Sequence, residues 1–201
     1  MNATLKIGLA VFLVLLLIGG CEQRGPTTDA RQRPEAPAFS LTDHTGQRHD
    51  LADYRGQIVV LEWVNPECPF VVRHYEAETM TTLANAYAEQ DVVWLAINTT
   101  SHFNQEMNKV FVEEFNLPYP VLDDSDGTVG RRYGAQTTPQ MVIVDKDGRI
   151  AYNGAIDDNP VGTQPQTVNY VSQALDQLLA GQPVTLSETQ PYGCSVKYPD
   201  L

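Results

Sequence analysis

Cys68 is the residue of this sequence whose type and surroundings are best suited to chemistry. It lies between Pro66 and Pro69, after an apolar run beginning at Ile58 that has the residues of a buried strand. An amphipathic segment follows, with Pro69 as the expected first helical residue, where the missing N–H of proline breaks no hydrogen bond. The Cys68 sulfur is therefore expected over the positive end of a helix, which lowers the pKa of a thiol and favours the thiolate. The alternative is a buried cysteine that packs as a small apolar residue.

A thiolate that attacks a disulfide or a peroxide needs a second thiol to complete the reaction. The chain has three cysteines, at positions 21, 68 and 194. Cys194 lies 126 positions after Cys68, in a flexible segment beyond Pro183 that could fold back over the site. Cys194 is thus the candidate resolving thiol. A purely structural disulfide and two unpaired thiols remain alternatives.

The polar neighbours of Cys68 give weaker signals. Arg73 and His74 lie five and six positions later, which on a helix means rotations of about 140° and 240° and a rise of roughly 9 Å. We therefore expect His74 on the surface or on a second helix face, not as an activating cation. The charge of Glu67 opposes thiolate formation. Asn65 suits either a hydrogen bond in the active loop or a turn cap.

The N-terminus predicts export. Lys6 precedes an apolar run from Ile7 to Ile18 that is too short to span a bilayer comfortably, and small residues follow it. The sequence Ile18-Gly19-Gly20-Cys21 resembles the bacterial lipobox, which implies a signal peptide over residues 1–20 and a lipidated Cys21. An uncleaved N-terminal anchor is the alternative. Both place the protein outside the cytoplasm, in the cell envelope, and tether it to a membrane.

Residues 21–37 contain three prolines among polar and charged residues and predict a flexible tether. Residues 38–201 then form one domain with one core, because about 160 residues suit a single domain. The formal net charge is −12 and no basic run exists. This composition argues against a nucleic-acid partner and against electrostatic binding to anionic lipid.

Apolar periodicity predicts an α/β domain without internal repeats. A β-hairpin turns at Asp43–Gly46, and its strands precede a buried strand at Gln57–Val64 and a helix at Pro69–Gln90. The expected elements that follow are a strand at Val92–Ile97, a helix capped by Ser101, a short strand at Pro120–Asp123, a hairpin of Gln140–Val144 and Arg149–Tyr152, and a last helix from Val168 to Leu179. Strands that alternate with helices early and pair in a hairpin late indicate a mixed central sheet covered on both faces.

These elements resemble a known fold. The order of three features is similar to the thioredoxin fold. They are a strand with Trp63, then Cys68-Pro69 at a helix start, and much later Thr138-Pro139 before a strand. The likeness to the redoxin and peroxiredoxin (AhpC/TSA-related) family, and to its exported members, rests on Phe39-Ser40-Leu41-Thr42-Asp43 with Gly46, Tyr133-Gly134, Val142 to Ile150, Asn65 to Val71 with His74-Tyr75, and Tyr192 to Tyr198. The resemblance spans about Ala38 to Tyr198 and implies a cis peptide bond at Pro139, packed against Cys68.

The chain also departs from these families. Thioredoxins carry a second cysteine three residues after the first, where this chain has Val71, so no local disulfide can form. Peroxiredoxins have a threonine and a proline where this chain has Asn65 and Leu61. The resemblance therefore implies an extracytoplasmic thiol–disulfide oxidoreductase or thiol-dependent peroxidase, with Cys68 as nucleophile.

The implied substrate is a thiol, a disulfide or a peroxide, on a protein or a small molecule. We expect no cofactor and no bound metal. A copper-handling thioredoxin-like lipoprotein is one alternative, since thiolates suit Cu(I). A lipoprotein scaffold that keeps the fold without catalysis is the other.

Overall fold

The computed structural model of the protein describes residues 33–164 and 167–200. The predicted signal peptide, Cys21 and most of the predicted tether lie outside these residues. None of the helices in the two described ranges is long and apolar enough to cross a membrane.

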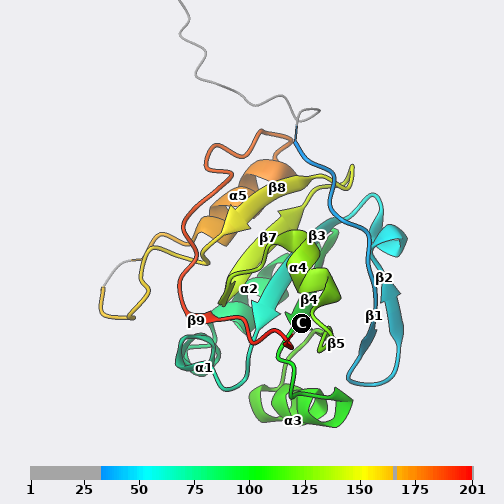
Figure 1. Ribbon diagram of the computed structural model, residues 1–201. Coiled ribbons are helices and arrows are strands. Elements are labelled where there is room, and N and C mark those ends of the chain that lie inside the picture. Colours follow the sequence, from blue (N-terminus) through cyan, green and yellow to red (C-terminus); the bar gives the residue numbers. More distant parts are fainter. Residues whose placement is uncertain (1–32, 165–166, 201) are drawn as a thin grey trace, which may run out of the picture.

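A seven-stranded mixed sheet forms the centre of the domain, with the strand order β2-β1-β5-β4-β3-β7-β8 (Figure 1). Its strands are β1 (Ser40–Asp43), β2 (Arg48–Asp50), β3 (Ile58–Val64), β4 (Val92–Asn98), β5 (Val121–Asp123), β7 (Gln140–Val144) and β8 (Ile150–Gly154). β3, β4 and β5 are parallel neighbours, whereas β7 pairs with β3 in the antiparallel direction. The predicted mixed sheet is confirmed.

Helices cover both faces of the sheet, as expected. On one face α1 (Pro69–Glu76), α2 (Thr79–Tyr87), α3 (Gln105–Phe115) and α5 (Tyr170–Leu179) contribute to one apolar core. On the other face α4 (Thr128–Tyr133) packs with Phe39 and a 3-10 helix at Leu51–Tyr54. β3 lies between the two cores, and every one of its seven residues is buried. This explains why its sequence is a continuous apolar run with a single charged residue.

The helix predicted at Pro69–Gln90 is wrong in one respect, because the chain breaks it into α1 and α2. Glu78 adopts a left-handed conformation with φ of 53° between the two helices. Tyr75 and Met80 are both buried, although residues five positions apart on one helix would differ by about 140°. The break turns both side chains into the same core.

Two further helix predictions need correction. Asn104, not Ser101, caps α3, and its side-chain oxygen accepts from the Met107 N–H at 3.0 Å. Thr100 to Phe103 first form a turn that buries Phe103, so the helix begins later. The short helix α4 was not expected, because its sequence carries two glycine boundaries and little apolar period.

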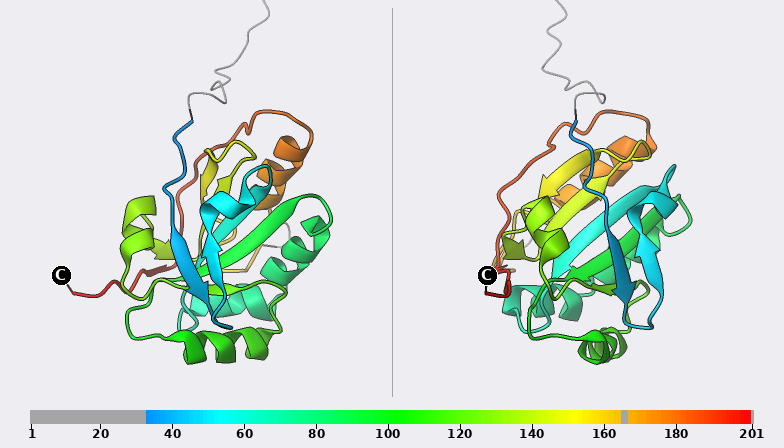
Figure 2. Two further views of the ribbon diagram at one scale, coloured as in Figure 1. Left: turned by 90° about the vertical axis from the view of Figure 1, so that its right-hand side faces the viewer. Right: turned by 45° about the vertical axis from the view of Figure 1, so that its right-hand side comes forward.

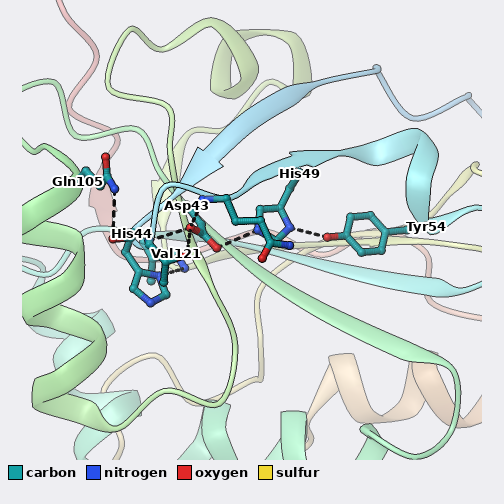
Figure 3. A network of polar contacts seen from close by, with 8 residues as sticks. Asp43, His44, His49, Tyr54, Gln105 and Val121 are labelled. Carbon is teal, nitrogen blue, oxygen red and sulfur yellow. Dashed lines mark hydrogen bonds and ion pairs between the residues drawn. The ribbon is translucent and has the colours of Figure 1, made fainter.

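The predicted N-terminal hairpin is confirmed, and a polar network closes it (Figure 3). The Asp43 carboxylate accepts from the Thr45 and Gln47 N–H groups and lies 2.9 Å from His49 Nε2. The other ring nitrogen of His49 contacts the Tyr54 hydroxyl. Burial alone would raise the pKa of Asp43, but these hydrogen bonds, that of His49 first, lower it to about 2.

Candidate functional site

Cys68 is the N-cap residue of α1, and Pro69 is the first residue of the helix, as predicted. The loop from β3 is fixed by Asn65, whose side-chain oxygen accepts from the Glu67 N–H at 2.9 Å and whose carbonyl accepts from the Cys68 N–H at 2.9 Å. Of the two roles considered for Asn65, the structure shows the turn cap. Trp63 is fully buried against Tyr133 and is a core residue.

The Cys68 thiol is 1% exposed and donates to the Thr138 carbonyl at 3.0 Å. The Thr138–Pro139 peptide bond is cis, as expected. Thr138 belongs to the two-residue strand β6 (Thr137–Thr138), which leads directly into β7. The start of α1 and the segment before β7 thus meet at Cys68.

Cys194 reaches the same place from the end of the chain. It begins the short strand β9 (Cys194–Ser195), which is labelled in Figure 1. β9 pairs with β6 so that Cys194 stands opposite Thr138. In the described part of the chain Cys68 and Cys194 are both free thiols, and each shifts the pKa of the other. The structure therefore brings Cys68, Cys194 and Pro139 together.

The tail that carries Cys194 was expected to be flexible, but it is docked along its length. Both views of Figure 2 show the chain after α5 crossing the molecule to its opposite side. Thr189 bonds to the edge of β8 at Asn153, and Val196 and Lys197 bond to Gln136 and Ser101. The Tyr198 hydroxyl donates to the Ala135 carbonyl at 2.7 Å. The tail is therefore an integral part of the candidate site.

The two thiols have different acidities. Burial raises the pKa of Cys68, but hydrogen bonds from the Cys194 thiol, Thr138 and the Val71 N–H outweigh it and leave this pKa below its usual value. Burial and the neighbouring Cys68 raise the pKa of Cys194 to about 11. Cys68 is thus the thiol that ionises first. Among the described residues the buried Thr138 hydroxyl has no other hydrogen-bond partner, so it is free to donate to that thiolate.

Glu67, whose charge was expected to oppose the thiolate, is directed to another group. Its carboxylate lies 3.0 Å from His102 Nε2, and both side chains are more than half exposed. Solvent and the histidine therefore weaken its effect on Cys68.

Sequence reasoning missed Glu62, which is fully buried in the middle of β3. Its carboxyl group accepts from Trp94 Nε1 and the Tyr75 hydroxyl, both at 2.8 Å, and from Tyr119 at 3.3 Å. Burial raises the pKa of Glu62 to about 7, although the three donors oppose the shift. The signal was present, since a lone acidic residue interrupts an apolar strand six positions before Cys68.

We expected His74 on the surface or on a second face of the helix. The surface position is wrong, because the residue is 1% exposed. The loop after β8 and the tail residue Tyr192 cover the helix face that carries it. Burial and the nearby Arg73 lower the pKa of His74 to about 4, so the ring is neutral at neutral pH. Arg73 bonds to the carbonyls of Asn159 and Pro160, and its Nη2 lies 3.0 Å from His74 Nε2.

Within residues 33–164 and 167–200, no three His, Cys, Asp or Glu side chains are grouped so as to hold a metal ion. The copper-handling alternative gains no support from the described part of the chain.

Comparison with known proteins agrees with this geometry. The family described as AhpC/TSA matches residues 33–153. Thiol-disulfide oxidoreductase ResA of Geobacillus thermodenitrificans is 34% identical over 116 residues, which are 57% of this chain and 64% of that protein. The match thus spans less than two thirds of that relative. Thioredoxin-like protein YneN of Bacillus subtilis is 29% identical over 183 residues, covering 86% of this chain and 98% of YneN.

Among solved structures, an uncharacterised conserved protein from Geobacillus kaustophilus superposes with a TM-score of 0.77 at 30% identity. That match covers 84% of this chain and 93% of the other. It supports the thioredoxin-like fold seen here. Cys194 and the tail lie beyond the residues that match the AhpC/TSA family.

Proposed function

This chain belongs to the AhpC/TSA family, and from that premise we propose that it is a thiol–disulfide oxidoreductase that uses Cys68 as nucleophile and Cys194 as resolving thiol. One observation carries the proposal. The pairing of β9 with β6 sets Cys194 opposite Thr138, whose carbonyl accepts from the Cys68 thiol. Two free cysteines so far apart in sequence meet at a helix N-terminus, where a thiolate is stabilised.

The reaction follows from the two acidities. The Cys68 thiolate attacks one sulfur of a substrate disulfide, forming a mixed disulfide and releasing the first substrate thiolate, which takes up a proton. Cys194 then loses its proton and attacks Cys68 Sγ, which breaks the mixed disulfide and releases the second substrate thiol. The substrate gains two electrons, the protein holds a Cys68–Cys194 disulfide, and an external dithiol reduces it again. Run in reverse, the same steps oxidise a substrate dithiol.

The surrounding residues have defined parts in this scheme. The Val71 N–H and the Thr138 hydroxyl stabilise the negative charge on Cys68. Pro139 follows Thr138 through the cis bond, and its ring approaches Gly193, the residue before Cys194. The high pKa of Cys194 keeps it protonated until the mixed disulfide has formed.

We favour disulfides over peroxides as substrates. Asn65 serves as a turn cap at the position where the peroxiredoxin resemblance implies a threonine, and Leu61 is a core residue where it implies a proline. The similarity to ResA, a thiol-disulfide oxidoreductase, agrees with this ranking. A rate with hydrogen peroxide well above that with a model disulfide would make the protein a peroxidase instead.

Serine variants test the roles of the two thiols. With a small-molecule disulfide as probe, Cys68→Ser should lose all exchange, and Cys194→Ser should stop at a mixed disulfide on Cys68 that mass spectrometry detects. If Cys194→Ser turns over normally and only unfolds at lower temperature, the pair is structural and the proposal fails.

We also propose that the domain acts outside the cytoplasm, held to a membrane by a lipid on Cys21. The motivation is the lipobox-like sequence before that residue. Expression in a bacterium followed by mass spectrometry of the N-terminal peptide should find an acylated Cys21, which Cys21→Ser abolishes. A free α-amino group on any other residue of the mature protein would contradict this.

A further inference from the structure

A partly buried polar cluster, which we call the Tyr192 cluster, consists of Arg73, His74, Asp157 and Tyr192. It joins the helix that follows Cys68 to the tail that carries Cys194. The Tyr192 hydroxyl lies 2.9 Å from His74 Nε2 and donates to Asp157 Oδ1 at 2.5 Å. The Tyr192 ring also stacks on the His74 ring, with 6.1 Å between the centroids and 29° between the planes.

Three segments that are distant in sequence meet in this cluster. Arg73 and His74 belong to α1, Asp157 follows β8, and Tyr192 belongs to the tail. Arg73 fastens the second segment to the first, because it donates to the carbonyls of Asn159 and Pro160, each at 3.2 Å. The cluster thus ties the tail to the helix that begins at Cys68.

The pairing of β9 with β6 cannot by itself hold Cys194 in place. It involves two residues on each strand, whereas even a complete isolated hairpin is marginal in water. The upstream anchor of the tail, Thr189, lies five positions before Cys194. Tyr192 lies two positions before Cys194, so its contacts fix the last stretch of chain before the thiol.

We propose that Tyr192 is a positioning residue that, through the contacts of its hydroxyl with Asp157 and His74, holds Cys194 against Cys68 and raises its effective concentration there. This inference rests on the proposed function. An ordered neighbour reacts as though it were highly concentrated, because the entropy of bringing the groups together is already lost in folding. Release of Tyr192 lets Cys194 explore more positions and slows the step that breaks the mixed disulfide.

The test uses Tyr192→Phe, which keeps the ring and its contact with Phe70 and removes only the hydroxyl. Equilibration of the protein with reduced and oxidised glutathione measures the effective concentration of Cys194 towards Cys68. Loss of hydrogen bonds worth about 1 kcal/mol should lower that concentration about fivefold. For this two-electron couple a tenfold change equals about 30 mV, so a fivefold change equals about 20 mV. The mixed disulfide with glutathione should also persist longer than in the unchanged protein.

Tyr87→Phe is the matched control. The Tyr87 hydroxyl also donates to an aspartate, Asp176, at 2.8 Å, but it joins α2 to α5 and not the tail to α1. A purely structural effect would lower the unfolding temperature of both variants and leave the glutathione equilibrium of both unchanged. That result would overturn the inference.

A second variant guards against misfolding of the first. Asp157→Asn removes the charge that accepts from Tyr192 and keeps the tyrosine, so it should shift the glutathione equilibrium in the same direction. Iodoacetamide should modify Cys194 faster in both variants than in Tyr87→Phe. If Cys194→Ser turns over normally, the proposed function fails. If Cys194 does resolve the mixed disulfide but Tyr192→Phe and Asp157→Asn behave like Tyr87→Phe, only the positioning role fails.

Discussion

Glu62 should make the domain less stable as the pH rises from acid to neutral, and Glu62→Gln should remove this dependence. The side chain lies fully buried on the β3 face covered by α1 and α2, between Val60 and Val64. Three neutral donors contact it, and no cation forms a salt bridge with it in the described part of the chain. A carboxyl group in such a place resists ionisation.

The direction follows from proton linkage. The pKa of Glu62 is about 7 in the folded protein and 4.5 when the side chain is in water. Between these values the folded state binds a proton that the unfolded state has lost, so the free energy of unfolding falls as the pH rises. The contribution is fully present below pH 4.5 and is lost as the pH passes 7. The difference of about 2.5 in pKa, at 1.36 kcal/mol each, amounts to about 3 kcal/mol.

Urea unfolding of the reduced protein between pH 4.5 and pH 8 measures this contribution of Glu62 to the free energy of unfolding. Comparison with Glu62→Gln cancels the titration of all other groups, and the difference between the two curves should grow by about 3 kcal/mol across the range. Glu89→Gln, at an exposed position of the same chain, is the control and should run parallel to the unchanged protein. If the curve for Glu62→Gln is also parallel to that of the unchanged protein, burial does not shift the titration of Glu62, and the predicted loss of stability with pH is wrong.

Three further changes test the site and the fold. A side chain at Gly193 would place its Cβ 2.0 Å from the Thr138 carbonyl oxygen, at a φ of 129°, so Gly193→Ala should separate β9 from β6 and speed alkylation of Cys194. Thr138→Val removes a donor to the Cys68 thiolate and should raise the pKa of Cys68, as read from alkylation rate against pH; an unchanged profile would exclude that hydrogen bond. Asn104→Ala removes the α3 cap and should cost about 1 kcal/mol in urea unfolding, whereas Ser101→Ala should cost less.

The central strands could be predicted from the sequence because their signal is local. The run from Ile58 to Val64 is buried on both faces, so it needs no alternation, and the strand Gln140–Val144 has the bounds that its apolar residues predict. Pro69 likewise marks the helix start at Cys68 by its own chemistry. These features depend on neighbours in sequence, so they can be predicted without knowledge of the fold.

The helix break at Glu78 and the burial of His74 were not predicted, because they depend on contacts between residues that are distant in sequence. Nothing local requires Glu78 to leave the helix; the gain is the burial of Met80 beside Tyr75. His74 has the composition of a surface residue and is buried only because Asp157 and Tyr192, 83 and 118 positions later, close over it. Helix geometry predicted His74 on the surface or on a second helix face but could not show what would cover it.

The tail has, within a few residues, both features that the sequence predicts and features that depend on distant contacts. The sequence singles out Cys194 because the proposed chemistry needs a second thiol, and its glycine and aromatic neighbours suit a segment that lies against the domain. The register of β9 against β6 depends on Gly193, which passes so close to the Thr138 carbonyl that no side chain fits between them. A shift of β9 by one residue would place Ser195 opposite Thr138 and turn Cys194 to the other side of the strand. The contact that would make Cys194 a resolving thiol is therefore set by the backbone approach at Gly193 and by Tyr192. The sequence shows these residues but not the register that joins them to the site.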